Sequence, residues 1–298
     1  QQWTATALAL AGNGAMTAEV LSLTGMAAYW LTLRGDYEEA VRLSSRALSE
    51  ASPVPEEARF WCSLALHMAQ FALGDITAAA AAAEQLAAVT ADASPYRKLC
   101  AAVMTAQASY VGGSGTRAAY EDVVRLADEI RSPSARSFAA GHRAMIAYLN
   151  GDRAAASELF REAVGHAHGA GLLTLEGGWM TGLAMALRGF SMDDAASAEA
   201  LGSMLRHAAE ANDGLSTWTG LEVLAIHLAE VGNLEPASVI LGHLEAANRR
   251  TADLAADRKA AIDALHDYPE AAERMAHGAR MSREALVEYA IRAATGAQ

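Results

Sequence analysis

The sequence of 298 residues contains few prolines, aromatic residues and cysteines, and its basic residues are almost all arginine. With only 6 prolines, long stretches are free to form helices, and the abundance of alanine favours them. The two cysteines, Cys62 and Cys100, are too few for a disulfide framework. We therefore expect a helical cytoplasmic protein in which both thiols are reduced and buried on helix faces.

Basic charge and long apolar runs are also scarce. The formal net charge of -12 at pH 7 argues against a general nucleic-acid surface and against binding to anionic lipid. No apolar run is long enough to cross a bilayer, and no signal peptide opens the chain. Because Gln1 is not an initiator residue and the chain begins within a helical pattern, we expect a fragment of a longer protein.

The chain lacks the motifs that carry catalysis, phosphate binding or metal binding. Neither of its two lysines follows a glycine, so there is no phosphate-binding loop, and the glycine-rich stretch 112–115 is interpreted as a turn. His166 and His168 lie two residues apart and would point to different sides of a helix, which makes them a poor pair of metal ligands. We predict a non-catalytic chain without a metal site or a cofactor of its own.

Turns that contain glycine recur about every forty residues, an interval typical of repeated helical hairpins. They are Gly35–Asp36, Gly74–Asp75, Gly112–Gly115, Gly151–Asp152, Gly189 with Asp193 and Asp194, and Gly232–Asn233. The first helices of the hairpins are predicted at 17–34, 56–73, 95–111, 134–150, 172–188 and 215–231. The second helices are predicted at 36–51, 75–91, 116–131, 152–169, 193–211 and 234–248. Only stacking of neighbouring hairpins can bury their apolar stripes, so the pattern predicts an α-solenoid.

The turn and second helix of the first hairpin resemble the tetratricopeptide repeat. Gly35-Asp36-Tyr37 opens this helix, Ala40 and Ala47 are small residues on one of its faces, and Pro53 follows it. The sequence therefore predicts an all-α, tetratricopeptide-like right-handed superhelix of about six hairpins. We assign the repeats to residues 1–248 and a set of C-terminal capping helices to residues 249–298.

The end of the chain carries a more specific resemblance. The segments 234–247 and 281–290 are similar to helices in large actinobacterial-type transcriptional regulators of the AfsR-like and LuxR-like kinds, which carry a signal-transducing P-loop ATPase module. His243 and Arg283 depart from the common pattern, which leaves the subfamily open. The resemblance implies that this chain is the helical-repeat arm of such a regulator. ATP would then bind in a module upstream of Gln1.

Aromatic and methionine side chains on the predicted first helices are the first candidates for binding. In tetratricopeptide-like arrays these helices line the concave surface, so the side chains would form a groove for an apolar ligand or a partner helix. We expect Trp61, Tyr148 and Trp179 to be the most exposed, and the alternative is packing between repeats. The series is Tyr29, Trp61, Met68, Phe71, Tyr110, Phe138, Met145, Tyr148, Trp179 and Trp218.

Basic residues near the starts of three first helices are the second candidates. Arg59, Lys98 and Arg136 recur at the repeat interval, and with Arg143 they would form a positive strip for an anionic ligand or an acidic partner segment. A cation at a helix N-terminus opposes the helix dipole, which calls for an explanation. The alternative explanation is ion pairing with acidic residues of the second helices, namely Glu84, Glu121, Asp122 and Glu158.

The combined hypothesis is a non-catalytic sensory or protein-interaction domain of a multidomain bacterial transcriptional regulator. It would bind a partner protein or a small-molecule inducer on its concave face and so shift the activity of the ATPase module. The alternative is a stand-alone peptide-binding adaptor. Neither hypothesis includes contact with nucleic acid or membrane from this chain, and both are compatible with a homo-oligomer.

Overall fold

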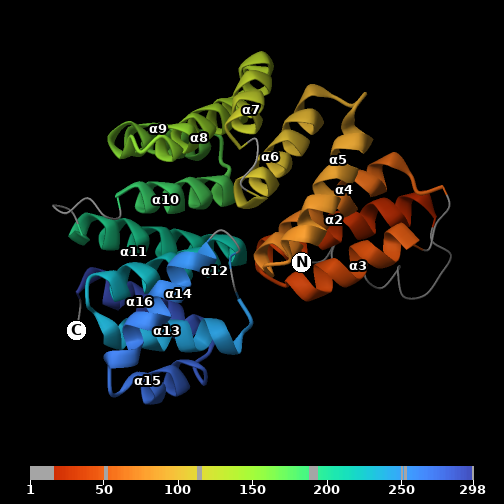
Figure 1. Ribbon diagram of the computed structural model, residues 1–298. Coiled ribbons are helices and arrows are strands. Elements are labelled where there is room, and N and C mark those ends of the chain that lie inside the picture. The colour runs from red at the N-terminus through yellow and green to blue at the C-terminus, as the bar shows by residue number, and fades with distance from the viewer. Residues whose placement is uncertain are drawn as a thin grey trace. The chain divides into compact units, whose positions relative to one another are not determined.

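The structure is a computed structural model, which describes residues 17–49, 53–112, 116–187, 194–249, 251 and 254–296. Their regular secondary structure consists of the α-helices α2 to α16 and one short 3-10 helix, η2, with no strand among them (Figure 1). The predicted all-α fold is therefore confirmed. None of the helices in this part of the chain is long and apolar enough to cross a membrane.

The helix bounds agree with the predicted ranges to within a few residues, because glycine turns end the helices where expected. Gly35 adopts a left-handed conformation with φ of 84°, and the N–H groups of Gly35 and Asp36 bond to the last carbonyls of α2. Asp75 and Asp152 each accept a hydrogen bond from the backbone at the start of the following helix. The predicted turn residues at 113–115 and 189–193 lie outside the described residues.

The chain divides into two compact units, residues 1–130 and residues 131–298. This division falls inside the predicted repeat array. The superhelical course of the whole array stays a prediction, and each unit is described by itself.

The first unit stacks three pairs of helices. Each first helix packs on the second helix of its pair, and α2, α4 and α6 also contact one another in turn. The small, fully buried side chains of Ala40 and Ala47 lie on α3 within this packing. The helices are α2 (Ala18–Arg34), α3 (Tyr37–Ser49), α4 (Glu56–Ala72), α5 (Ile76–Thr90), α6 (Pro95–Gly112) and α7 (Thr116–Ile130).

The second unit continues the alternation and adds the C-terminal helices. Helices α8 to α13 pack in sequence, while α14 packs on α12, α15 on α13, and α16 on α11, α12 and α13. The elements are α8 (Pro133–Leu149), α9 (Arg153–Gly169), α10 (Leu173–Leu187), α11 (Asp194–Ala211), α12 (Gly214–Glu230), α13 (Leu234–Ala246), α14 (Ala255–Ala264), η2 (Leu265–Asp267), α15 (Ala271–Gly278) and α16 (Arg283–Thr295).

The C-terminal helices pack closely against α12 and α13. A Cβ atom on Gly242 would lie 2.1 Å from the carbonyl oxygen of Met275, so the backbones of α13 and α15 nearly touch. The buried carboxylate of Glu222 on α12 accepts hydrogen bonds from Arg258 on α14 and, at 2.8 Å, from the backbone N–H of Thr251. The predicted boundary at residue 248 thus lies inside the second unit, and the distinction between repeats and cap stays a prediction.

Candidate binding surface

Two aromatic side chains from successive first helices meet where a glycine brings those helices together. A Cβ atom on Gly25 of α2 would lie 2.8 Å from the Cβ of Trp61 on α4, so α4 can take this position only because Gly25 lacks a side chain. One helical turn after Gly25, the ring of Tyr29 contacts the indole of Trp61, with 5.4 Å between the ring centroids. Tyr29 in turn contacts Trp30 at 6.2 Å, and Trp30 is 57% exposed.

A carboxylate links these rings to the next first helix. The indole nitrogen of Trp61 donates a 2.7 Å hydrogen bond to Glu57, one turn earlier on α4. The other carboxylate oxygen of Glu57 accepts a hydrogen bond from Arg97 on α6. The Arg97 guanidinium also lies over the ring of Phe60, 4.8 Å from its centroid. Tyr29, Trp30, Glu57, Trp61 and Arg97 therefore form one connected surface over α2, α4 and α6, which we call the aromatic surface.

The electrostatics of the aromatic surface favour an ionised Glu57. Partial burial raises the pKa of its carboxyl group, but hydrogen bonds from Trp61 and Arg97 outweigh burial and leave this pKa below its usual value. Glu56 lies 3.7 Å from a guanidinium nitrogen of Arg97. Two carboxylates thus share one guanidinium.

The residue types on this surface suit recognition of a macromolecule. Tryptophan, tyrosine and arginine are the side chains that contribute most often to binding energy at protein interfaces. Cys62 is buried beside this surface, and burial raises the pKa of its thiol to about 12, which keeps the thiol protonated.

Of the predicted aromatic series, Trp179 takes a packed position in the second unit. Its indole nitrogen donates a 2.9 Å hydrogen bond to the hydroxyl of Ser137, which is fully buried and donates to the carbonyl of Ala163. A Cβ atom on Gly141 would lie 2.5 Å from the Trp179 ring. These contacts match the alternative of packing between repeats.

Tyr148 and Trp218 also take part in packing. Tyr148 lies against the apolar cluster around Phe160, and the guanidinium of Arg153 lies 5.4 Å from its ring centroid. Trp218 is buried, with its ring stacked on His243 at 5.7 Å. The structure therefore brings together Tyr29 and Trp61 in the first unit, and Tyr148 and Trp179 around Phe160 in the second.

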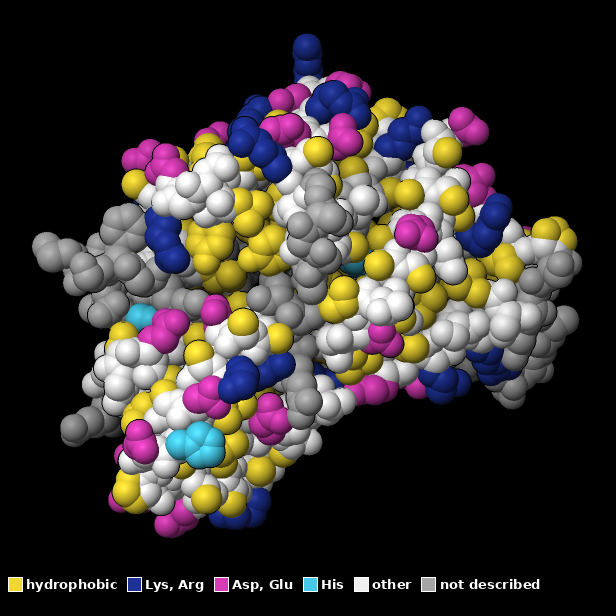
Figure 2. Space-filling model, in the orientation of Figure 1, with side chains coloured by type: hydrophobic (Ala, Val, Ile, Leu, Met, Phe, Trp, Pro, Cys, Tyr) yellow, Lys and Arg dark blue, Asp and Glu magenta, His cyan; other side chains and the backbone are white. Residues whose placement is uncertain are grey.

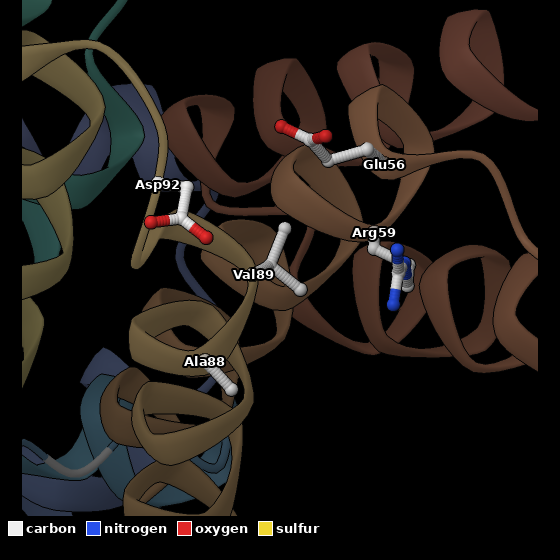
Figure 3. Close-up of a pocket in the computed structure, with 5 residues that line it drawn as sticks. All are labelled: Glu56, Arg59, Ala88, Val89 and Asp92. Carbon is white, nitrogen blue, oxygen red and sulfur yellow. The ribbon is translucent and has the colours of Figure 1, made fainter.

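Arg59 and Lys98 of the predicted basic series lie on the two sides of the C-terminal end of α5. Arg59 lines a cleft of about 240 Å³ with Glu56, Ala88, Val89 and Asp92 (Figure 3). Lys98 lines a groove of about 420 Å³ whose other lining residues are Ala87, Thr90, Ala91, Ala101, Ala102, Thr105, Ala118, Ala119 and Asp122. The carbonyls that end α5 carry partial negative charge, which accounts for cations in the first turns of α4 and α6.

Two of the acidic residues predicted to pair with this series pair with other basic residues. Among the described residues, neither Arg59 nor Lys98 makes an ion pair, while Glu121 pairs with Arg117 at 2.9 Å and Asp122 with Arg125 at 3.3 Å. Figure 2 shows basic and acidic side chains interspersed on the visible face instead of gathered in fields of one sign. A continuous positive strip stays a prediction.

Arg136 and Arg143, the other two basic candidates, lie on α8 in the second unit, where both side chains are exposed.

The two histidines considered as metal ligands each lie near a different glutamate in the second unit: His166 lies 3.4 Å from Glu162, and His168 lies 3.2 Å from Glu176. Among the described residues, no group of three or more histidine, cysteine or acidic side chains is placed to hold a metal ion.

Sequence reasoning missed three members of the aromatic surface. The predicted residues include Tyr29 but not its neighbour Trp30, and Lys98 but not its neighbour Arg97. They do not include Glu57. A usable signal was present for the pair Glu57 and Arg97, since they are separated by 40 residues, one repeat interval. An acidic and a basic residue at that spacing are expected to meet on stacked first helices.

Comparison with known proteins supports the fold. No protein-family model and no curated protein sequence matches the chain. Among solved structures, the chain is similar to a Rap protein in complex with competence and sporulation factor, with a TM-score of 0.67 and 14% sequence identity. The match covers 95% of this chain and 80% of the Rap chain. At this identity the likeness shows a tetratricopeptide-like helical-repeat fold.

Proposed function

We propose that this chain is a non-catalytic interaction module that binds a polypeptide segment of a partner protein on the aromatic surface of its first unit. The observation that carries the proposal is the exposed Trp30, connected through Tyr29 to Trp61. Exposure of an indole to water is unfavourable in free energy, and a partner that covers Trp30 removes this cost. The connected aromatic rings are held on packed helices, so they need little rearrangement to bind a partner.

The spacing of the helices favours a polypeptide over a small molecule as the occupant. Packed helix axes lie about 8–10 Å apart, so a ligand that reaches from α2 to α6 spans roughly 20 Å. An extended segment of about six residues covers that distance. The similar Rap structure contains a bound factor, which supports a binding role for this fold.

We further propose that this module belongs to a multidomain cytoplasmic transcriptional regulator, which the resemblance of the C-terminal segments supports. Binding of the partner would shift the equilibrium of an upstream ATPase module through its different affinity for the two states. The alternative is a stand-alone peptide-binding adaptor. The coding sequence before Gln1 distinguishes the two, since a phosphate-binding loop there supports the regulator and its absence supports the adaptor.

The basic series supports a second candidate for the occupant. Lys98 lies at its groove without an ion pair among the described residues, which favours an acidic side chain of the segment at the end of α5. The charge of the bound segment therefore indicates which site it occupies: an acidic segment would indicate the groove beside Lys98 rather than the aromatic surface.

The test is selection of binding peptides from a random display library of about twelve residues on the purified chain. Selected peptides are then measured by fluorescence anisotropy against the wild type, Trp30→Ala and Leu173→Ala. Leu173 is the matched control, an exposed apolar residue in the second unit. We expect Trp30→Ala to weaken binding by about tenfold or more at an unchanged melting temperature. If no peptide is selected, or if all bind Trp30→Ala as well as the wild type, the proposal is wrong.

A further inference from the structure

We infer, on the basis of the proposed function, that the segment recognised by the aromatic surface is basic. It would place an arginine or lysine side chain at the carboxylates of Glu56 and Glu57 and an apolar side chain on Trp30. The inference concerns the chemical class of the partner.

The carboxylates at the start of α4 exceed the cations that neutralise them. Glu57 shares Arg97 with Glu56, so this group carries one net negative charge. Arg59 and Asp92, which line the adjoining cleft with Glu56, add one charge of each sign and leave the balance unchanged. A negative site on a chain of net charge -12 attracts a positive partner and repels an acidic one.

Arg97 is held in a position that leaves Glu56 available. Its guanidinium donates to Glu57 and lies over the Phe60 ring, while its distance of 3.7 Å from Glu56 is beyond a normal hydrogen bond. The Glu56 side chain is 58% exposed, so a partner can reach it. A guanidinium or ammonium group from outside would gain a charge-assisted hydrogen bond there without breaking one.

The indole of Trp61, which donates a hydrogen bond to Glu57, also favours a cation at these carboxylates. The face of an indole attracts guanidinium and ammonium groups, and tryptophan binds them best of the aromatic residues. The nearest basic residue along α2 is Arg34, one turn after Trp30, and it lies 3.6 Å from Asp36. The end of α2 is therefore balanced in charge, and the negative excess lies at Glu56 and Glu57.

The groove beside Lys98 offers a direct contrast. Its lining has one cation, Lys98, and one anion, Asp122, around alanine and threonine side chains. It has no exposed aromatic residue and no net charge. The net negative charge and the exposed tryptophan that favour a basic partner at the aromatic surface are therefore missing from this groove.

The experiment uses the peptides selected on the wild-type chain and their versions with every arginine and lysine replaced by glutamine. Affinities are measured for the wild type, Glu56→Gln and Glu84→Gln. Glu84 is the control because it is an exposed glutamate of the same unit, on α5 and outside the surface. We expect the glutamine peptides to bind about tenfold more weakly. Glu56→Gln should weaken the basic peptides several-fold but leave the glutamine peptides unchanged, and Glu84→Gln should change neither.

The outcomes separate the inference from the proposed function. Peptides that depend on Trp30 but are neutral or acidic would overturn the inference and leave the proposed function intact. Basic peptides whose affinity is the same for Glu56→Gln and the wild type would also overturn it. Peptides that bind without regard to Trp30 would overturn the proposed function, and the inference with it.

Discussion

Gly25 of α2 and Trp61 of α4 are so close that a Cβ atom on the glycine would lie 2.8 Å from the Cβ of the tryptophan. Gly141 of α8 and Trp179 of α10 repeat the relationship in the second unit, where the distance to the ring is 2.5 Å. In both cases a glycine on one first helix accommodates a tryptophan on the next. In the first unit this contact also positions Trp61 beside Tyr29 and so builds the aromatic surface.

The substitution Gly25→Ala should therefore overpack the contact between α2 and α4. The methyl group would meet Trp61 and Cys62, so we expect the free energy of unfolding to fall by about 1–3 kcal/mol. Urea denaturation of the purified chain measures this change. Gly178→Ala is the matched control, because nothing lies within 4 Å of its Cβ position on α10. There, the better helix propensity of alanine should stabilise the chain by up to about 1 kcal/mol. Equal stability of the two variants would mean that α2 and α4 are not in close contact.

A charge at Ala40 should disrupt the packing of α3. Ala40 is fully buried, so Ala40→Glu buries a carboxylate without a partner, and we expect a loss of about 3 kcal/mol or more. Ala81→Glu places the same side chain on an exposed position of α5 and should change the melting temperature little. Thermal unfolding followed by circular dichroism compares the two. An unchanged melting temperature for Ala40→Glu would show that Ala40 is not buried against the neighbouring helices.

His142 should make the second unit less stable as the pH falls. Burial lowers the pKa of His142 to about 4, although its hydrogen bond to the Phe138 carbonyl opposes this shift. In the unfolded chain the pKa is about 6.5, so between these values only the unfolded state binds the proton. Stability should fall by up to about 3 kcal/mol across this range. His142→Gln should flatten the dependence in urea denaturation at pH 7, 5.5 and 4.5, and identical slopes in both proteins would contradict the assignment.

Glu57 should contribute stability at neutral pH that is lost in acid. Burial raises the pKa of Glu57, but the hydrogen bonds from Trp61 and Arg97 lower it by more, so the net pKa is below its usual value. A carboxyl group with a lowered folded-state pKa stabilises the fold above its unfolded pKa of about 4.3 and loses this effect as the pH falls through the folded value. Glu57→Gln should therefore lower the melting temperature at pH 7 and have a smaller effect at pH 3. An equal effect at both values would exclude an ionised Glu57.

Much of the helical architecture follows from local signals in the sequence. Gly35 ends α2 because its left-handed backbone conformation suits glycine, and Asp75 begins α5 because its carboxylate accepts a free backbone N–H. Such effects act over a few residues and can be predicted without knowledge of the fold. The division between residues 130 and 131 has no comparable local signal.

The candidate binding surface was harder to predict, because exposure depends on neighbouring helices. Trp30 and Trp61 both lie on first helices, but Trp61 faces Gly25 and Trp30 faces solvent. Arg97 and Lys98 are adjacent, yet successive helical positions differ in direction by about 100°. Arg97 therefore reaches Glu57, and Lys98 lines a separate groove.

The central claim is that a basic segment binds at Trp30, and site-specific photo-crosslinking tests it most directly. The photoreactive residue p-benzoylphenylalanine is added to one end of a labelled basic peptide selected on the wild-type chain, so that Trp30 itself is kept. After irradiation with the wild-type chain, mass spectrometry locates the crosslinked residues. The account predicts crosslinks to the aromatic surface on α2 and α4, and none to the groove beside Lys98 or to the second unit. A bound peptide that crosslinks only to that groove or to the second unit would contradict it.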